Sequence, residues 1–241
     1  MGQLEVATAD GAMGVYDAVP ATPARAAVVV VQEAFGVNPH IRAVADRFAE
    51  SGYRAVAPHL FHRTGDPELS YTDIDSIRPH MQALTEPGLL ADLDGVLRYL
   101  AEGGFEAARV GIVGFCMGGS VAMFAGSRFD LGAAVSFYGG GVVEARMGMP
   151  SLLEVARELR CPWLGLYGDL DQGIPVEQVE ALRSAAATAS VDTEVVRYPE
   201  AGHGFHCDAR PSAYHAASAT DAWRRTLDWF GRYLPGGHVE V

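Results

Sequence analysis

The sequence has 241 residues, of which 30 are acidic and 18 basic, and its formal net charge is −12. All 18 basic residues are arginine, which excludes Schiff-base lysines, Ser–Lys dyads and the lysine of a phosphate-binding P-loop. The acidic balance argues against nucleic acid and membrane as partners, since anionic surfaces bind basic ones, and no run reaches the roughly 18 apolar residues of a membrane-spanning helix.

The length fits one domain, and we expect residues 1–241 to form it. Cys116, Cys161 and Cys207 are an odd number of cysteines and too few for a disulfide framework. They predict a reduced protein, so the cytoplasm is the expected location. A small-molecule partner and a monomer or small homo-oligomer complete these expectations.

Short β-branched runs alternate with helical patterns along the chain. The run 26–32 is apolar on both faces and predicts a buried parallel strand. Asn38 and Pro39 are expected to begin a helix that Gly52 ends, and residues 53–57 to form the next strand. We interpret the polar stretch 59–87 as a loop with short helical pieces, a kind of segment that often borders a site.

The alternation continues to the end of the chain. The expected helices are 87–103, 117–127, a short one near 151–158, 176–187 and 217–234, and the expected strands are 109–114, 133–138, 162–167 and 193–198. Such repeated units predict the α/β class, with a mostly parallel central sheet and helices on both faces. The sites of these sheets lie at the carboxyl ends of the strands.

Residues Gly114–Gly118 carry the strongest local signal for chemistry. They fit the nucleophile-elbow pattern G-x-S-x-G with Cys116 in the serine position, between an expected strand and an expected helix. A helix N-terminus favours the thiolate, which is the reactive form of cysteine. The structural alternative is a buried cysteine beside glycines that pack the helix, and we favour the catalytic interpretation because of the strand–turn–helix context.

A thiol nucleophile needs a base and an acid that orients the base. His203 lies between two glycines just past strand 193–198 and is the expected base. Asp169 and Asp171 both follow strand 162–167, and we favour Asp171 as the orienting acid. The alternative is that both aspartates cap the helix that starts near Pro175.

The loop after strand 26–32 supplies two more candidates. An oxyanion hole needs two backbone N–H groups, and those of Met117 and Ala34 are expected to form it. Glu33 is a carboxylate at the end of a very apolar strand, where an unpaired charge would be costly. Either it reaches solvent or a nearby arginine, or it faces Cys116 and helps control the protonation of the thiol.

Four segments together resemble the dienelactone hydrolase family: QEAFGVN (32–38), GFCMGG (114–119), GDLDQGIP (168–175) and EAGHGF (200–205). The resemblance runs from about residue 26 to 234 and implies an α/β-hydrolase fold. It implies that Cys116, Asp171 and His203 form the triad and that Glu33 holds the thiol before substrate arrives. The implied reaction opens an unsaturated lactone to an oxo-diacid, without a metal or an organic cofactor.

The resemblance is weaker where the family holds the substrate carboxylate with two arginines. Cys207 occupies one of these positions and Ile74 lies near the other. Arg210 and Arg78 are the candidates to replace them from shifted positions. Phe35 and Tyr138 complete the predicted substrate-binding set.

Two alternatives to an ester or lactone hydrolase remain open from the sequence. The same fold could serve a non-catalytic ligand-binding protein or a redox sensor with Cys116 as its oxidisable thiol. A metal site could combine His203, His206 and Cys207, but their spacing is not that of the H-E-x-x-H helix, and we expect no metal.

Overall fold

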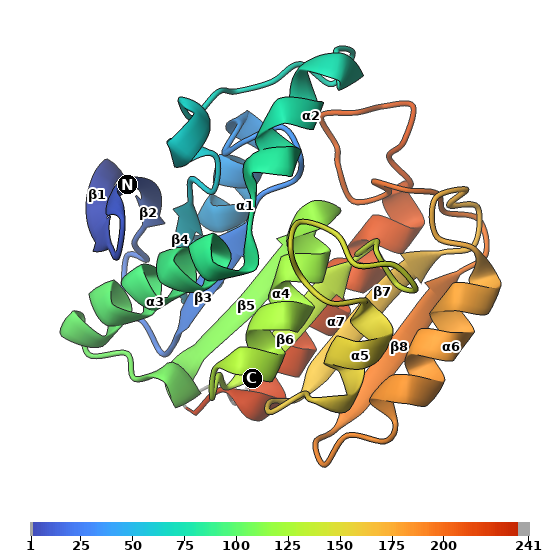
Figure 1. Cartoon of the computed structure of the whole chain (residues 1–241). Coiled ribbons are helices and arrows are strands. Elements are labelled where there is room, and N and C mark those ends of the chain that lie inside the picture. Colours follow the sequence, from blue (N-terminus) through green and yellow to red (C-terminus); the bar gives the residue numbers. More distant parts are fainter. Residues whose placement is uncertain (1, 236–241) are drawn as a thin grey trace.

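The computed structural model describes residues 2–235; Met1 and residues 236–241, which belong to the predicted single domain, lie outside them. Within this range eight strands form one sheet in the order β1-β2-β4-β3-β5-β6-β7-β8 (Figure 1). All neighbours from β4 to β8 are parallel, whereas β1 pairs with β2, and β2 with β4, in antiparallel fashion. The strands are β1 Gly2–Thr8, β2 Gly11–Ala18, β3 Ala27–Val31, β4 Arg54–Pro58, β5 Val110–Phe115, β6 Ala133–Phe137, β7 Trp163–Gly168 and β8 Thr193–Tyr198.

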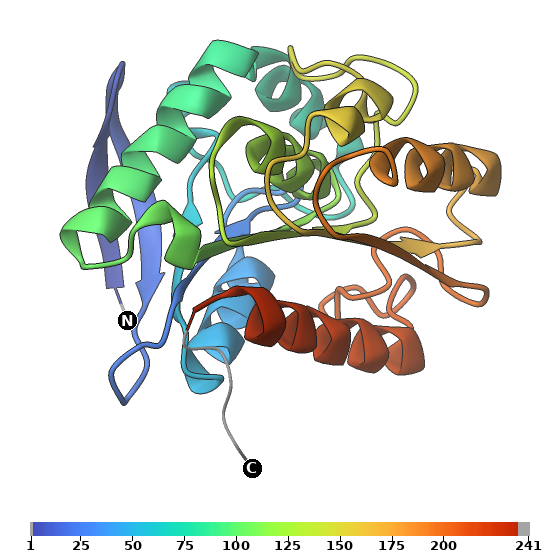
Figure 2. The same ribbon diagram turned by 90° about the horizontal axis from the view of Figure 1, so that it is seen from below.

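Helices cover both faces of the sheet, as predicted. Helices α1 (Pro39–Glu50) and α7 (Ala216–Tyr233) lie on one face, and α3 (Glu86–Glu102), α4 (Met117–Arg128), α5 (Leu152–Arg157) and α6 (Val176–Ala186) lie on the other (Figure 2). The polar stretch after β4 contains the short 3-10 helix His62–Thr64 and helix α2 (Ile74–Ala83), and a second 3-10 helix, Ala107–Arg109, precedes β5.

Local sequence accounts for where the first helix begins and ends. The side chain of Asn38 accepts a hydrogen bond from the Ile41 N–H at 3.1 Å, and Pro39 occupies the first helical position. Gly52 follows the last turn with a φ of 85°, a conformation that glycine adopts without strain. The five residues of β3 that precede this helix are all buried, as an apolar strand in the middle of a parallel sheet requires.

The N-terminal hairpin of β1 and β2 has no counterpart in the sequence-based expectations. Most side chains of β1 are exposed, so its apolar alternation is weak. In β2, Met13 and Val15 are fully buried. The Asp10-Gly11 pair, which lies at the turn, is the signal that could have revealed this hairpin.

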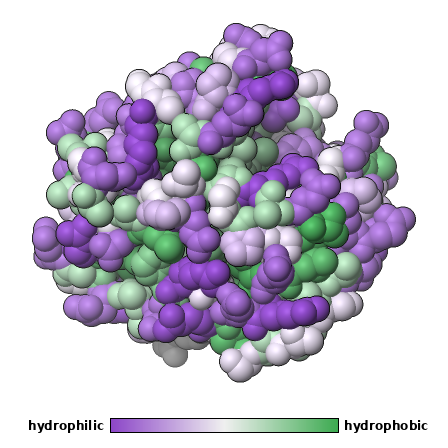
Figure 3. All heavy atoms as spheres, viewed as in Figure 1, coloured by the Kyte–Doolittle hydropathy of each residue, from purple (hydrophilic) through white to green (hydrophobic). Residues whose placement is uncertain are grey.

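The surface on the side of Figure 1 is mainly hydrophilic, with hydrophobic residues scattered between the polar ones (Figure 3). Among residues 2–235, no helix combines the length and the apolar character needed to cross a membrane.

Candidate active site

The turn between β5 and α4 holds Cys116 in a strained conformation. Its φ of 56° and ψ of −119° are values that a residue with a side chain rarely adopts. A Cβ at Gly114 would lie 1.8 Å from the Gly118 carbonyl oxygen, and a Cβ at Gly118 would lie 2.4 Å from the Gln32 carbonyl oxygen. Glycine is therefore required at both positions, and the nucleophile-elbow geometry predicted from the pattern is present.

The structure separates the roles of the two aspartates that follow β7. Asp171 Oδ2 lies 2.6 Å from Nδ1 of His203, and its Oδ1 accepts a 2.8 Å hydrogen bond from the Gly173 N–H. Asp169 instead accepts two hydrogen bonds of 2.7 Å from Arg197. Neither aspartate caps α6, whose N-terminal position is Pro175 without a side-chain cap.

The electrostatic surroundings of His203 favour its charged form. Burial disfavours the imidazolium, but hydrogen bonding and charge interactions with Asp171 and Cys116 outweigh burial and raise the pKa of His203 to about 10. The imidazole therefore interacts with a carboxylate on one side and with the thiol on the other. A thiol beside an imidazole that a carboxylate orients is an arrangement suited to nucleophilic catalysis.

A cavity of about 230 Å³ opens onto the thiol and the imidazole. Its volume suits a small molecule, and much of its wall is apolar. The backbone N–H groups of Met117 and Ala34 donate to no backbone carbonyl within residues 2–235. The lining residues are Met81, Cys116, Met117, Ser120, Gly140, Arg146, Met147, Gly173, Ile174 and His203.

Glu33 does not reach solvent, because its side chain is completely buried. Burial raises the pKa of its carboxyl, and the charge of Arg210 opposes this effect without forming an ion pair within 4.0 Å. Tyr138 and Cys207 are close neighbours, but neither forms a hydrogen bond of normal geometry with the carboxylate oxygens. The surroundings of Glu33 therefore shift its equilibrium towards the neutral carboxylic acid.

The predicted substrate-binding residues divide into two groups. Arg210 is close to the site: its guanidinium carbon lies 5.5 Å from the centre of the Phe35 ring, and its charge acts on Glu33. Phe35 and Tyr138 are buried beside the site, with the Tyr138 ring 5.0 Å from that of His203, but they do not line the cavity.

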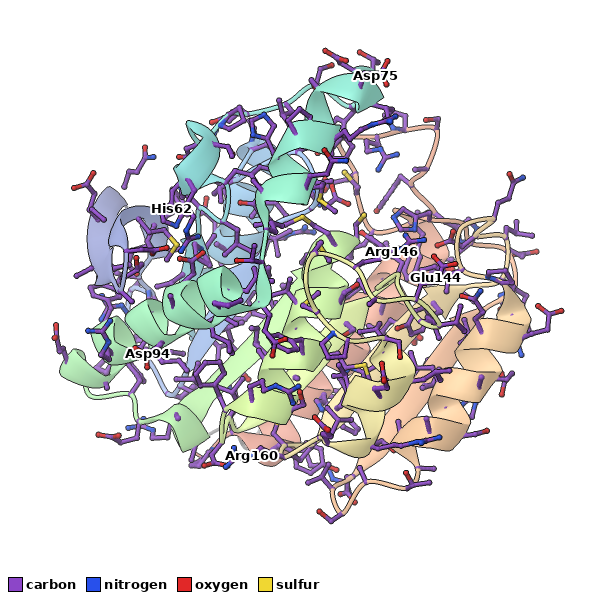
Figure 4. The ribbon with its side chains drawn as sticks, in the orientation of Figure 1. His62, Asp75, Asp94, Glu144, Arg146 and Arg160 are labelled. Carbon is purple, nitrogen blue, oxygen red and sulfur yellow. The ribbon has the colours of Figure 1, made fainter. Side chains whose placement is uncertain are left out.

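Arg78 is not brought to the cavity. Its side chain is 72% exposed and pairs with Asp75, one turn away on α2, and Asp75 points outward in Figure 4. The expected role of Arg78 therefore needs correction, because its charge remains in solvent. Met81, three residues further along the same helix, lines the cavity instead.

Arg146 is the cation of the cavity wall that the sequence reasoning missed. It lies on the loop after β6, beside Glu144, whose carboxylate is 3.8 Å from its guanidinium (Figure 4). The available signal was its position after a parallel strand, since loops at the carboxyl ends of such strands form the sites of α/β proteins.

The three residues of the alternative metal site, His203, His206 and Cys207, are not gathered around one point. His206 is buried among aromatic rings, stacked on Phe115 at 5.2 Å, and burial holds its pKa well below the usual value. Within residues 2–235, the donor atoms that do come together belong to Glu33, His40 and Cys207.

Comparisons with known proteins agree on one family. The sequence pattern of the dienelactone hydrolase family matches residues 13–234. An Escherichia coli protein with the provisional name carboxymethylenebutenolidase is 43% identical over 209 residues, which are 86% of this chain and 76% of that protein. A protein of the same provisional name from Methylorubrum extorquens is 39% identical over 237 residues, covering 96% of this chain and 81% of its own. The crystal structure of a provisionally named dienelactone hydrolase from Klebsiella pneumoniae has 39% identity and a TM-score of 0.89, covering 96% of this chain and 98% of the other.

Proposed function

The chain belongs to the dienelactone hydrolase family, and from this premise we propose that it hydrolyses a carboxylic ester or lactone through Cys116, His203 and Asp171. The observation that carries the proposal is the 2.6 Å contact of His203 with Asp171, next to a thiol on a strained turn. Nucleophile, base and orienting acid are the parts that covalent acyl transfer requires. Family membership supports this reaction over a ligand-binding or redox-sensing role.

In the first half of the proposed reaction, the Cys116 thiolate forms a bond to the substrate carbonyl carbon. The carbonyl electron pair moves to the oxygen, and the N–H groups of Met117 and Ala34 are the proposed donors to this oxyanion. His203 then gives its proton to the leaving alkoxide as the carbon–oxygen bond breaks. A thioester on Cys116 results, and the alcohol of a lactone stays attached to it.

The second half of the reaction returns the enzyme to its starting state. Neutral His203 removes a proton from water, and the resulting hydroxide attacks the thioester carbonyl. The carbon–sulfur bond breaks, the acid product leaves, and Cys116 is again a thiolate beside an imidazolium. Asp171 keeps the ring in one tautomer through both halves, because it accepts the proton on Nδ1. None of these steps needs a cofactor.

Glu33 is proposed to control the proton of the nucleophile. Burial favours the neutral acid, and the carboxyl lies in the electrostatic field of His203 and Arg210. We propose that Glu33 exchanges a proton with Cys116, and this exchange does not change the net charge of the site. The resemblance to the family implies that Glu33 holds the thiol before substrate arrives and then helps to form the thiolate.

The cavity wall narrows the proposed substrate to a small molecule with an apolar body. Met81, Met147 and Ile174 offer apolar contacts, and Arg146 offers one positive charge. The resemblance implies that two arginines bind the carboxylate of dienelactone in the family; Cys207 stands at one of these positions and Ile74 lies near the other. Arg210 keeps one positive charge near the site, so dienelactone belongs among the substrates to test.

The test measures hydrolysis of p-nitrophenyl acetate and of cis- and trans-dienelactone by the wild type, Cys116→Ala and Cys161→Ala. Cys161 is a matched control, because it is a buried cysteine outside the cavity. Cys116→Ala is expected to lower kcat/KM by at least about 100-fold, since it removes the nucleophile. Cys161→Ala is expected to stay within about threefold of the wild type, since it touches no reacting group.

The identity of the hydrolysed substrate decides whether the chain carries out the family reaction or acts on another ester. Hydrolysis of dienelactone would assign the family reaction, whereas hydrolysis of the acetate alone would keep the thiol mechanism and give the chain another substrate. Mass spectrometry of acid-quenched enzyme should find the acetyl group on the peptide that contains Cys116. Full activity of Cys116→Ala would contradict the proposal, and no turnover together with no acyl adduct would favour binding or sensing.

A further inference from the structure

Three metal-ligating side chains meet next to the triad, and the proposed reaction gives a role to only one of them, Glu33. One carboxylate oxygen of Glu33, one ring nitrogen of His40 and the sulfur of Cys207 all lie within 4.8 Å of one another. Glu33 follows β3, His40 belongs to the first turn of α1, and Cys207 lies four residues after His203. All three are buried, with exposed fractions of 0%, 3% and 0%.

Three polar atoms of this cluster lack partners among the described residues. Both carboxylate oxygens of Glu33 and Nε2 of His40 are buried without a hydrogen bond to any described residue. Such groups are costly to bury, so an unsatisfied set of them calls for an explanation. A bound cation would satisfy all of these atoms together.

The second nitrogen of His40 is held in the way that is typical of histidine ligands. Its Nδ1 lies 2.9 Å from Oδ1 of Asp208, so the proton resides on Nδ1 and the lone pair on Nε2. Carboxylate–histidine–metal arrangements use this contact to fix both the tautomer and the direction of the ring.

We propose that Glu33, His40 and Cys207 form a zinc-binding site beside the catalytic triad. One thiolate, one imidazole and one carboxylate are donors that suit Zn²⁺, and a thiolate argues against Mg²⁺ and Ca²⁺. Zinc bonds of about 2.0–2.3 Å would bring these ligands closer together than they are here, by side-chain shifts of about 1 Å. The fourth position is left to water or to the hydroxyl of Tyr71, which lies 3.5 Å from Cys207 Sγ.

The charges of the ligands suit this ion. Zinc binds the ionised forms of a carboxyl and a thiol, so Glu33 and Cys207 as bound ligands balance the two positive charges of Zn²⁺.

The site shares Glu33 with the reaction, and zinc is therefore an inhibitor. An ion bound to the carboxylate removes the group that exchanges a proton with Cys116. This consequence rests on the proposed function, whereas zinc binding itself does not.

The binding test uses Co²⁺ as a spectroscopic probe and Zn²⁺ as its competitor. All proteins carry Cys116→Ser, so that the catalytic thiol cannot bind the metal, and the second change is either Cys207→Ser or the matched Cys161→Ser. Co²⁺ is expected to give a sulfur-to-metal charge-transfer band in the Cys116→Ser and Cys116→Ser/Cys161→Ser proteins, and Zn²⁺ should remove it. Cys207→Ser is expected to abolish the band, and Glu33→Gln to weaken Zn²⁺ binding at least about tenfold, because each removes one of the three ligands.

Circular dichroism and thermal unfolding of every variant show that it is folded. A band that persists in the folded Cys207→Ser protein, or the absence of any band in the Cys116→Ser protein, would overturn the proposal.

The inhibition test uses proteins that keep Cys116. The Zn²⁺ concentration that halves hydrolysis of p-nitrophenyl acetate is expected to rise at least about tenfold in Cys207→Ser and to stay unchanged in Cys161→Ser, because only Cys207 belongs to the zinc site. Equal inhibition of both variants would place the inhibitory zinc on Cys116 and His203 and overturn the regulatory consequence. If the wild type hydrolyses no ester, the cobalt band still decides whether the site exists.

Discussion

In the proposed mechanism, the proton on His203 sets the pH range in which the site can react. Asp171 and Cys116 stabilise the imidazolium against the effect of burial and raise the pKa of His203 to about 10. The proposed reaction needs the charged form twice, to hold the thiolate and to protonate the leaving alkoxide. Under this proposal, loss of the proton disables the free enzyme.

We expect kcat/KM to fall as the pH rises through about 10, and Asp171→Asn to move this fall to lower pH. The amide removes the negative charge that favours the imidazolium, so the proton is lost earlier. A pH–rate profile with p-nitrophenyl acetate measures both curves. If Asp171→Asn kept the same alkaline limb, Asp171 would not be the group that holds the proton.

The same raised pKa links the stability of the fold to pH. A group that binds its proton more tightly when folded stabilises the protein fully below its unfolded pKa of 6.5, and this contribution disappears as the pH rises to about 10. The difference in the free energy of unfolding between the wild type and His203→Gln should therefore shrink between these two values. Urea unfolding at several pH values measures this difference, and one that grows with pH would contradict the assignment.

Arg146 is the residue of the cavity wall that can distinguish charged from neutral substrates. Its side chain is 59% exposed, so its contact with a carboxylate should contribute no more than about 1 kcal/mol. Arg146→Gln should therefore raise KM about fivefold for an ester that carries a carboxylate and leave p-nitrophenyl acetate unchanged. Arg78→Gln, which lies on α2 outside the cavity wall, is the control and should change neither KM.

At the scale of single elements, the elbow works because β5 and α4 approach each other so closely that no side chain fits between them. Gly118 packs against the backbone at the end of β3, and Gly114 packs against Gly118 itself. The turn therefore fixes the thiol of Cys116 and the N–H of Met117 relative to each other. A displacement of β5 would move the proposed nucleophile with it.

Gly118→Ala is expected to destabilise the fold by about 3 kcal/mol or more, because its Cβ would lie 2.4 Å from the carbonyl oxygen of Gln32. Gly202→Ala is the matched control near the site, since its Cβ would meet no atom closer than 3.8 Å. That change should alter the free energy of unfolding by less than about 1 kcal/mol. Denaturant unfolding of both variants provides the comparison, and equal stability of the two would contradict this account of the elbow.

The elements with strong local signals could be predicted from the sequence, and those held by distant contacts could not. The helix that begins after Asn38 and the strand before Cys116 carry caps, glycines and apolar runs, and the structure places them within about two residues of the expected positions. For the polar stretch 59–87 the sequence predicted only a loop with helical pieces. Its helix α2 has a weak apolar pattern, because Ile77 is its single buried residue and Pro79 lies inside it.

At the scale of the whole molecule, the N-terminal hairpin is joined to the rest of the sheet by the pairing of β2 with β4, and a group of three polar side chains reinforces this connection. Arg54 on β4 and Tyr99 on α3 each reach the Asp17 carboxylate of β2 at 2.8 Å, and they bond to each other at 2.6 Å. Asp17 is 6% exposed, so this group lies largely out of water. It ties one strand, its neighbour and the covering helix together.

Asp17→Asn should lower the free energy of unfolding by about 2 kcal/mol, because Arg54 would remain partly buried without a counter-charge. Asp94→Asn is the control, since it removes an exposed pair with Arg98 on the surface of α3. That change should cost less than about 0.5 kcal/mol. Urea unfolding measures the free energy of unfolding of the two variants. Equal losses would show that the Asp17, Arg54 and Tyr99 group contributes no more stability than a surface ion pair.

The overall architecture could be predicted from the sequence. The α/β-hydrolase fold that the resemblance implied is confirmed by the likeness to the Klebsiella structure, at a TM-score of 0.89. The choice of Asp171 over Asp169 depended on where Arg197 lies, and the burial of Glu33 on what covers it. The position of Arg146 depended on the path of the loop after β6, and the position of Arg78 on how α2 lies against the cavity. Such details arise from contacts between distant parts of the chain, which no local pattern encodes.

Cys116, Asp171 and His203 follow three different strands, β5, β7 and β8, and meet only because those strands are aligned side by side. Asp171 and His203 are 32 residues apart in the sequence, so they meet only when β7 and β8 are paired. During refolding from urea, catalytic competence therefore cannot precede closure of the β7–β8 edge, although helices form much earlier. The rate at which activity returns thus reports on the most non-local step in the assembly of this sheet.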